Sequence, residues 1–333
     1  MDQETQQVYD NHGRRINYVR LAVTDRCNLR CFYCMPEHGI KYLPRKELLT
    51  YEEMERLLRI LTHLGVNKLR ITGGEPFVRQ NLMDFLERAA DIPNLEYIHL
   101  TTNGVLTAPY IPRLKAMGIS SINLSIDTLD RERFKQITRR DEVEKVKATF
   151  YELLEAGIPL KINAVVIDGK NTQDIVELAK LTREHRVDVR FIEEMPFNGE
   201  GAHYPELTWD HLRIKQELEQ HFGQLEALPG VANSTSVNYR IPGHQGSVGI
   251  IAAFSRTFCG SCNRIRITSQ GTLKTCLYDN GVLDLKGIMR SGAEDENIRQ
   301  HLLRAFGSRD RDGFEAESKR SYQISESMSV IGG

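Results

Sequence analysis

The feature of this sequence that most constrains its fold is a regular alternation of strand-like and helix-like segments between residues 16 and 193. Repeated strand–helix units predict a parallel sheet with right-handed crossovers, and therefore an α/β fold. Six units are too few for a closed eight-stranded barrel, so a partial barrel and an open sheet are the alternatives. In both, the active site is expected at the carboxyl ends of the strands. The expected strands are 16–23, 68–72, 97–101, 121–126, 160–167 and 187–193, and the expected helices between them are 50–64, 82–90, 109–117, 143–156 and 172–185.

The pattern changes after Met195, which indicates a second and smaller part of the chain. The segments expected there are a loop at 196–207, a helix at 209–222 and several short strands within 236–277. We place the boundary near 197–230 and predict two domains, residues 1–220 and residues 221–333. Segment 308–326 is charged and weakly patterned, so we expect it to be a surface or mobile segment.

Composition restricts the classes of partner. The chain has 333 residues with 44 basic and 45 acidic side chains, a net charge of −1. This balance argues against a broad nucleic-acid or anionic-membrane surface, although it leaves room for a local basic pocket. The longest apolar run, 248–254, is far short of the roughly 20 residues of a membrane helix. The first 13 residues are polar, unlike a secretory signal, so we expect a cytoplasmic protein.

All six cysteines fall into two groups of three. Cys27, Cys31 and Cys34 form a C-x3-C-x2-C triad, and Cys259, Cys262 and Cys276 form a C-x2-C-x13-C triad. In a reducing compartment such clusters indicate metal sites. Three thiolates on one loop can hold three irons of a [4Fe–4S] cluster, which leaves the fourth iron open to a small molecule. A structural zinc site with His38 as fourth ligand, and three unrelated thiols, are the alternatives for the first triad.

Two further features lie near the first triad. Tyr33 directly precedes Cys34, and its ring could cover a cluster or stack on an adenine. The sequence Thr72-Gly-Gly-Glu-Pro76 ends the second expected strand. Adjacent glycines there let a ligand approach the backbone, and Glu75 could receive an ammonium group. An ordinary structural turn is the alternative for the two glycines.

Together, these two motifs resemble the radical S-adenosylmethionine (SAM) superfamily. The resemblance implies a partial (β/α)6 barrel whose first triad binds a [4Fe–4S] cluster. It also implies that the amine and carboxylate of SAM chelate the open iron. One electron then splits SAM into methionine and a 5′-deoxyadenosyl radical.

The second triad narrows this resemblance. The stretch Cys259-Gly-Ser-Cys-Asn-Arg-Ile-Arg266, followed by Cys276, is similar to the C-terminal motif of the GTP 3′,8-cyclase family of molybdenum cofactor biosynthesis. Further matching motifs lie at 70–76, 101–104, 123–127, 161–163 and 190–195, and the resemblance runs from residue 18 to residue 333. It implies that the smaller C-terminal β-containing domain carries a second [4Fe–4S] cluster. The open iron of that cluster would hold guanine, so the implied cofactors are two clusters and SAM.

Basic side chains provide an independent reason to expect a phosphate ligand. Arg264 and Arg266 are two apart in a strand-like segment and therefore share one face. Arginine forms bidentate contacts with phosphate. Taken singly, each basic residue is an ordinary surface charge. Together, the candidates for a cationic lining are Arg20, Arg70, Lys161, Arg264 and Arg266.

The resemblance also implies roles for individual residues. For SAM, these are Tyr33, Gly74, Ser125 and Met195, although Tyr33 and Met195 could equally fill a core. For GTP, they are Arg20, Arg70, Thr101, Lys161, Arg264 and Arg266. Gly332 and Gly333 would thread into the active site and help to place the catalytic arginine Arg20, whereas the alternative is a frayed chain end.

The implied activity is that of a radical SAM lyase. The radical removes hydrogen from C3′ of GTP, and the C3′ radical adds to guanine C8. The resulting radical is reduced by one electron and protonated, and the product is (8S)-3′,8-cyclo-7,8-dihydroguanosine 5′-triphosphate. Implied partners are GTP, cyclic pyranopterin monophosphate synthase as the next enzyme, and an electron donor such as flavodoxin. We expect no nucleic acid and no membrane as partners, and a monomer or homodimer.

Two other functions remain open from the sequence. One is a different radical SAM enzyme with an auxiliary cluster, such as a peptide-modifying enzyme, which would need a peptide-recognition segment. The other is a non-catalytic metal-binding or regulatory module, for which six strand–helix units are more than the function needs.

Overall fold

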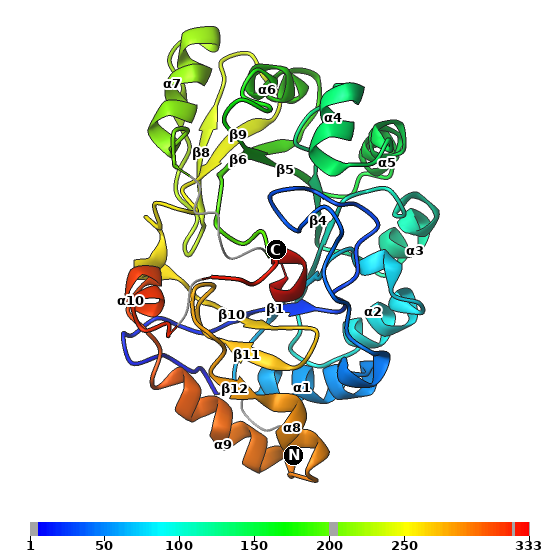
Figure 1. The fold of residues 1–333 in the computed structure, drawn as a ribbon, viewed down its shortest axis with the longest axis vertical. Coiled ribbons are helices and arrows are strands. Elements are labelled where there is room, and N and C mark those ends of the chain that lie inside the picture. The colour runs from blue at the N-terminus through cyan, green and yellow to red at the C-terminus, as the bar shows by residue number, and fades with distance from the viewer. Residues whose placement is uncertain (1–5, 200–205, 322–323, 333) are drawn as a thin grey trace.

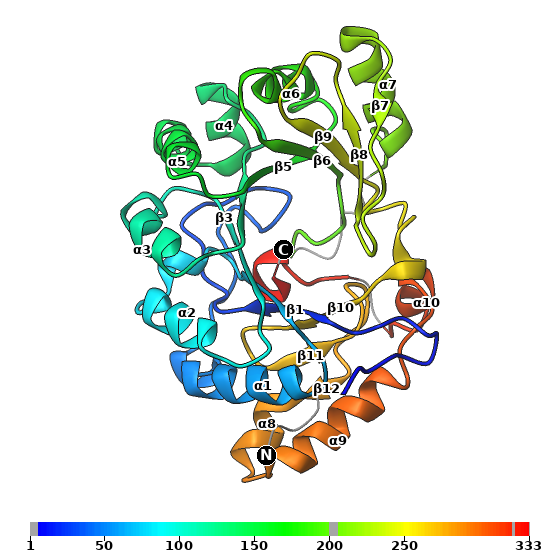
Figure 2. The ribbon, with the colours of Figure 1, turned by 180° about the vertical axis from the view of Figure 1, so that it is seen from behind.

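One continuous sheet organises the molecule. The structure, a computed structural model, describes residues 6–199, 206–321 and 324–332. These residues form a sheet of twelve strands in the order β12-β11-β10-β1-β2-β3-β4-β5-β6-β9-β8-β7. The helices pack around the outside of the curved sheet, and the C-terminal segment lies inside the curve (Figures 1 and 2).

The six expected strands form the centre of this sheet. They are parallel, and each pairs with the next strand in the sequence, as the alternating pattern predicts. Their bounds are β1 Tyr18–Ala22, β2 Lys68–Thr72, β3 Tyr97–Thr102, β4 Ser121–Ser125, β5 Leu160–Val166 and β6 Asp188–Glu193. Their carboxyl ends therefore lie along one rim, where the functional residues were expected.

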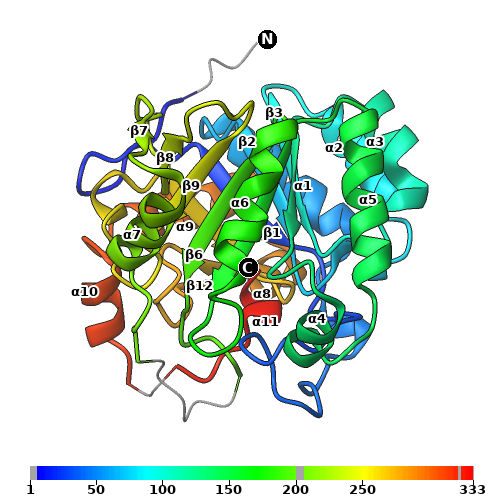
Figure 3. The same cartoon turned by 90° about the horizontal axis from the view of Figure 1, so that it is seen from above.

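Helices cover the outer face of the six central strands. Their bounds are α1 Tyr51–His63, α2 Leu82–Ala90, α3 Ile111–Ala116, α4 Arg131–Thr138, α5 Val143–Glu155 and α6 Asp174–Glu184. Figure 3 shows α6 lying across β6 and β9, both of which it contacts. The capping box expected at the start of α1 is present: the Glu53 amide donates to Thr50 Oγ1 (3.2 Å), and the Thr50 amide donates to Glu53 Oε2 (2.7 Å).

The C-terminal half extends both edges of the same sheet. Strand β10 (Arg264–Ile267) pairs in parallel with β1, and β9 (Ser247–Ile251) pairs in parallel with β6. The remaining strands, β7 Glu226–Ala227, β8 Ser236–Arg240, β11 Thr272–Lys274 and β12 Leu283–Asp284, continue these edges in antiparallel fashion. Within the described residues the sheet is not closed, so the predicted partial barrel is confirmed. The division of the chain at residue 220 stays a prediction.

Several helices differ from the sequence expectation. Helix α4 was not expected; Asp130 caps it by accepting from the Arg133 amide, and Phe134 and Ile137 are buried. The later helices are α7 His211–Phe222, α8 Leu285–Arg290, α9 Asp295–Phe306, α10 Gly313–Ser318 and α11 Met328–Ile331.

None of the helices in the described part of the chain is long and apolar enough to cross a membrane.

Candidate active site between two cysteine triads

A cavity of about 520 Å³ lies inside the curve of the sheet, and all six cysteines line it. Strand alternation explains the lining: on β5, Leu160, Ile162 and Ala164 are buried, whereas Lys161 and Asn163 face the cavity. The predicted site residues on its wall are Arg20, Tyr33, Arg70, Gly74, Thr101, Ser125, Lys161, Met195, Arg264 and Arg266. The structure therefore brings residues from both halves of the sequence around one space. Their individual roles stay predictions.

The first triad lies on the loop after β1. Burial raises the pKa of Cys27 to about 11, with the Glu75 carboxylate adding to the effect, and burial raises the pKa of Cys34 to about 12. The pKa of Cys31 is also raised, first by burial and then by Asp127 and the two other thiols. Three half-buried thiols, two of which raise the pKa of the third, need a strongly positive group to become stable thiolates, which is what an iron–sulfur cluster provides.

The geometry of the cysteines argues against a single metal ion. None of the cysteines forms a disulfide. Among residues 6–199, 206–321 and 324–332, no three His, Cys, Asp or Glu side chains converge on a position where they could hold one ion. The zinc alternative with His38 is therefore not supported.

The Gly73-Gly74 turn packs against the loop that leads to the first triad. A Cβ on Gly73 would lie 2.5 Å from the Thr24 carbonyl oxygen, and one on Gly74 would lie 2.3 Å from the Arg26 carbonyl oxygen. Side chains here would push this loop out of place. The close packing of this turn therefore explains why glycine occupies both positions. Gly74 also lines the cavity.

Glu75 does not face the cavity, contrary to the expectation that it receives an ammonium group. Its carboxylate is fully buried and accepts hydrogen bonds from Thr102 Oγ1 (2.8 Å) and the Asn103 amide (2.7 Å). Burial raises the pKa of Glu75 to about 7 despite these bonds. Glu75 therefore orders the end of β3, whose next residue, Asn103, donates from Nδ2 to Cys27 Sγ at 3.7 Å.

Tyr33 is held in a defined orientation at the cavity wall. Its hydroxyl donates to Asp127 Oδ2 at 2.7 Å, and Asp127 Oδ1 accepts from the Val165 amide at 2.9 Å. Burial raises the pKa of Asp127 to about 6. Tyr33 is thus tied through Asp127 to the ends of β4 and β5, and Ser125 lines the same cavity.

Basic side chains form a further part of the cavity lining. In the sheet register, Arg20 on β1 lies between Arg70 on β2 and Arg266 on β10. Burial, with Arg264 next in importance, lowers the pKa of Arg266 to about 10. Crowded cations with little exposure to solvent favour an anionic ligand. In the described residues Arg70, Lys161, Arg264 and Arg266 make no ion pair with a carboxylate, in contrast to Arg190, which pairs with Asp188 at 2.6 Å.

Sequence reasoning missed several residues on this wall. Lys68 and Arg190 add two cations, and Tyr18 accepts a hydrogen bond from Arg70 Nε at 2.6 Å. Burial would raise the pKa of Tyr18, but Arg70 and Arg20 outweigh burial and lower it to about 7. The sequence did contain a signal for Lys68 and Tyr18. They lie two residues before Arg70 and Arg20 on the same strands, so each pair shares one face of the sheet.

Buried polar atoms on the cavity wall also lack protein partners. Asn123 Oδ1, Asn163 Oδ1 and Arg264 Nε are buried and have no hydrogen-bond partner among the described residues. Such groups are costly to leave unsatisfied. A polar ligand in the cavity would supply the missing bonds.

The C-terminal tail contacts both sides of the cavity. Ser327 Oγ donates to the Cys34 carbonyl at 2.6 Å, and the Gly332 carbonyl accepts from Arg266 Nη1 at 2.5 Å. Gly332 has φ +78°, and a Cβ there would lie 2.4 Å from Thr72 Oγ1. The tail up to Gly332 is therefore not a frayed end. Gly333 lies outside the described residues.

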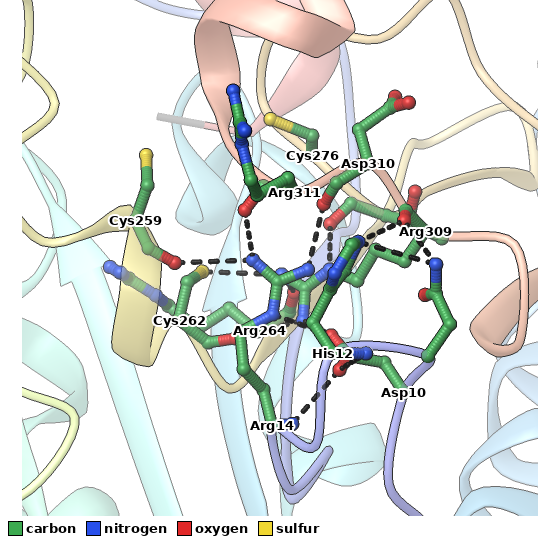
Figure 4. Close-up of polar contacts among 12 residues, drawn as sticks. Asp10, His12, Arg14, Cys259, Cys262, Arg264, Cys276, Arg309, Asp310 and Arg311 are labelled. Atoms are coloured by element: carbon green, nitrogen blue, oxygen red, sulfur yellow. Dashed lines mark hydrogen bonds and ion pairs between the residues drawn. The ribbon is translucent and has the colours of Figure 1, made fainter.

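A network of buried arginine side chains contacts the second triad (Figure 4). The sequence analysis did not predict this network. Arg309 Nη2 donates to Cys262 Sγ at 3.2 Å. Burial would raise the pKa of Cys262, but Arg264 and Arg309 outweigh burial and lower it to about 6. In contrast, burial raises the pKa of Cys276 to about 12. The expectation of a surface segment at 308–326 is wrong at Arg309, which is buried.

Comparisons with known proteins agree with this arrangement. Residues 21–182 match the radical SAM superfamily, and residues 187–314 match the family described as Molybdenum Cofactor Synthesis C. The GTP 3′,8-cyclase of Syntrophomonas wolfei is 41% identical over 95% of this chain and 99% of its own length. That of Moorella thermoacetica is 38% identical over 97% of this chain and 99% of its own length.

More distant comparisons cover part of a longer relative or show the fold alone. Human molybdenum cofactor biosynthesis protein 1 is 38% identical over 91% of this chain but only 48% of its own length. The chain thus spans about half of that relative. The crystal structure of Streptococcus suis SuiB superposes with a TM-score of 0.62 at 15% identity, over 93% of this chain and 70% of SuiB. From the near-complete match to bacterial relatives, this chain belongs to the GTP 3′,8-cyclase family, within the radical SAM superfamily.

Proposed function

We propose that this chain is a GTP 3′,8-cyclase acting in molybdenum cofactor biosynthesis. One observation carries the proposal: a single cavity is lined by both cysteine triads and by basic side chains from β1, β2, β5 and β10. A nucleoside triphosphate matches the basic wall, and two clusters match the two triads. The family membership of the chain points to the same substrate.

The first triad, Cys27, Cys31 and Cys34, would hold the cluster that binds SAM. When bound, this cluster and SAM would supply a 5′-deoxyadenosyl radical that removes hydrogen from C3′ of GTP; closure of C3′ onto C8, one-electron reduction and protonation would then give (8S)-3′,8-cyclo-7,8-dihydroguanosine 5′-triphosphate. We assign SAM contacts to Tyr33, Gly74, Ser125 and Met195. The bond from Tyr33 to Asp127 would fix the aromatic ring before the ligand arrives, which reduces the entropy cost of binding.

The other wall would bind GTP. We assign GTP contacts to Arg20, Arg70, Thr101, Lys161, Arg264 and Arg266, with the basic members of this set lining the triphosphate site, and we assign the guanine to the second triad. Lys68 and Arg190 lie on the same wall and join this assignment. Their charges would fix GTP so that its ribose faces the SAM side of the cavity. Because the curved sheet surrounds part of the cavity, it would also limit the access of solvent to a reactive radical.

The C-terminal tail would complete the site. We propose that Gly332 and Gly333 help to place the catalytic arginine Arg20. The bond from Arg266 to the Gly332 carbonyl supports a position of the tail beside Arg20, because Arg20 and Arg266 are register partners on neighbouring strands.

We also propose the setting of the reaction. The enzyme would act in the cytoplasm as a monomer or homodimer and receive electrons from a carrier such as flavodoxin. Its product, a reactive cyclised nucleotide, would pass to cyclic pyranopterin monophosphate synthase.

Anaerobic reconstitution followed by incubation with SAM, dithionite and GTP tests the proposal. We expect 5′-deoxyadenosine together with a cyclised nucleotide, and little 5′-deoxyadenosine when GTP is replaced by ATP. Equal SAM cleavage with both nucleotides and no cyclised product would reject the GTP assignment. Turnover that requires an added peptide would favour a peptide-modifying enzyme instead.

A further inference from the structure

Arg309 connects the two separate backbone segments that carry the second triad. It follows α9, and its guanidinium is buried. Nη1 donates to the Cys262 carbonyl (2.8 Å), and Nε donates to the Thr275 carbonyl (2.9 Å), directly before Cys276. Nη2 donates to the Arg264 carbonyl (2.9 Å) and to Cys262 Sγ (3.2 Å). One planar group thus fixes the backbone at Cys262 and next to Cys276 (Figure 4).

A second layer holds Arg309 in place. Asp10 Oδ2 pairs with Arg309 Nη1 at 3.3 Å and with Arg14 Nε at 2.6 Å, and the Asp10 side chain is fully buried. Arg14 Nη1 in turn donates to the Cys259 carbonyl at 3.2 Å. All three cysteine-bearing positions are therefore linked to the Asp10–Arg14–Arg309 network. Its two arginines share one buried carboxylate, so neither can move independently.

We propose that Arg309 is a positioning residue for the second cluster, and that its bond to Cys262 Sγ makes the reduction potential of that cluster more positive. An N–H donor to a ligand sulfur withdraws negative charge from it. This stabilises the reduced cluster, which carries the extra electron, more than the oxidised one. The backbone bonds of the same guanidinium keep Cys262 and Cys276 at a fixed separation. The inference rests on the second triad binding a cluster and does not depend on GTP being the substrate.

The first experiment measures cluster retention in the full-length chain with both triads. Arg309→Met removes every donor but keeps an unbranched apolar side chain. Arg311→Met is the matched control, because Arg311 lies on the same loop and its side chain is 76% exposed. Removal of outer partners of metal ligands typically weakens metal sites about 10- to 100-fold. We therefore expect R309M to lose iron from one cluster at a roughly 10- to 100-fold lower chelator concentration than R311M or the parent chain.

The second experiment measures the potential of the second cluster by itself. In a full-length chain with Cys27, Cys31 and Cys34 replaced by serine, EPR-monitored redox titration reports only the second triad. We expect R309M to shift its midpoint to a more negative potential, R309K to shift it less, and R311M to leave it unchanged. A partial rescue by lysine follows because an ammonium keeps the charge but lacks the planar fork.

The outcomes separate a positioning role from a general structural one. Iron retention and midpoint potential in R309M that match those of R311M would overturn the proposal. If R309M fails to fold, shown by circular dichroism and by loss of both clusters, R309K decides: a folded R309K with the parent potential would equally overturn it. Because neither readout uses GTP, a failed cyclase assay would leave this result unaffected.

Discussion

At the scale of single residues, Arg266 has one partner in the structure, the Gly332 carbonyl, and one proposed ligand, GTP. Replacement by alanine removes its bond to the Gly332 carbonyl and the charge proposed to bind GTP. A hydrogen bond to a charged group contributes roughly 1.5–3 kcal/mol, which is about 10- to 150-fold in affinity. We predict that Arg266→Ala weakens GTP binding by this factor and leaves SAM binding near normal, as measured by anaerobic calorimetry. Arg113→Ala, at an exposed ion pair, is the control. Unchanged GTP affinity in R266A would remove Arg266 from the site.

Lys161 gives the site a dependence on pH. Burial lowers the pKa of Lys161 to about 8, and Arg190 and Arg70 add to the effect, while Asp188 opposes it. The group is an ammonium below that pH and neutral above it, so affinity for an anion falls as pH rises. We predict that GTP affinity decreases by up to about tenfold between roughly pH 7 and pH 9.

Lys161→Arg is the matched variant for this prediction, because arginine stays charged across that range. It should lose clearly less GTP affinity over the same pH interval. Tyr18, whose pKa is about 7, is present in both proteins, so the comparison isolates Lys161. Identical pH profiles would show that Lys161 does not contact the triphosphate.

At the scale of secondary-structure elements, we expect the C-terminal tail to be the most sensitive to substitution. Helix α11 is followed by its C-cap residue Gly332, which combines φ +78° with a Cβ position 2.4 Å from Thr72 Oγ1. We predict that Gly332→Ala displaces the tail and blocks cyclised product, while both clusters and GTP binding are retained. Iron content, GTP titration and product chromatography measure the three properties. Gly118→Ala is the control, since Gly118 also has a positive φ but open space at its Cβ position. Full product yield from G332A would mean that the tail is dispensable.

The elements also show what could be predicted from the sequence. Helix α1 carries its capping box and apolar face locally, and it was predicted to within one residue at each end. Helix α4 was missed because only Phe134 and Ile137 mark its apolar side among charged residues. The parallel pairing of β9 with β6 and of β10 with β1 joins segments far apart in the chain, and no local pattern encodes such partners.

The parts of the candidate site that could be predicted were those whose residues belong to a recognisable motif. The two triads and the five predicted basic residues could be identified from spacing and resemblance, and the structure places them around one cavity. Arg309, in contrast, lies in a run of alternating charges that is indistinguishable from solvent-exposed sequence. Only tertiary contacts with Asp10 and the second triad reveal that it is buried.

At the scale of the whole molecule, the two triads should be separable. Cys31→Ser should abolish SAM cleavage, because the cluster proposed to reduce SAM would be lost. Cys276→Ser should retain a cluster at the first triad and some SAM cleavage uncoupled from product, but lose GTP turnover. Iron analysis and chromatography of 5′-deoxyadenosine distinguish the two variants. Loss of both clusters and of folding in C276S would make the second triad mainly structural.

The central claim is that one cavity holds SAM and GTP so that hydrogen leaves C3′ of GTP. GTP carrying deuterium at C3′ tests this claim most directly, with mass spectrometry of both products after anaerobic turnover. The account predicts 5′-deoxyadenosine that has gained one deuterium and a cyclised nucleotide that has lost it from C3′. Unlabelled 5′-deoxyadenosine formed alongside cyclised product would contradict the account.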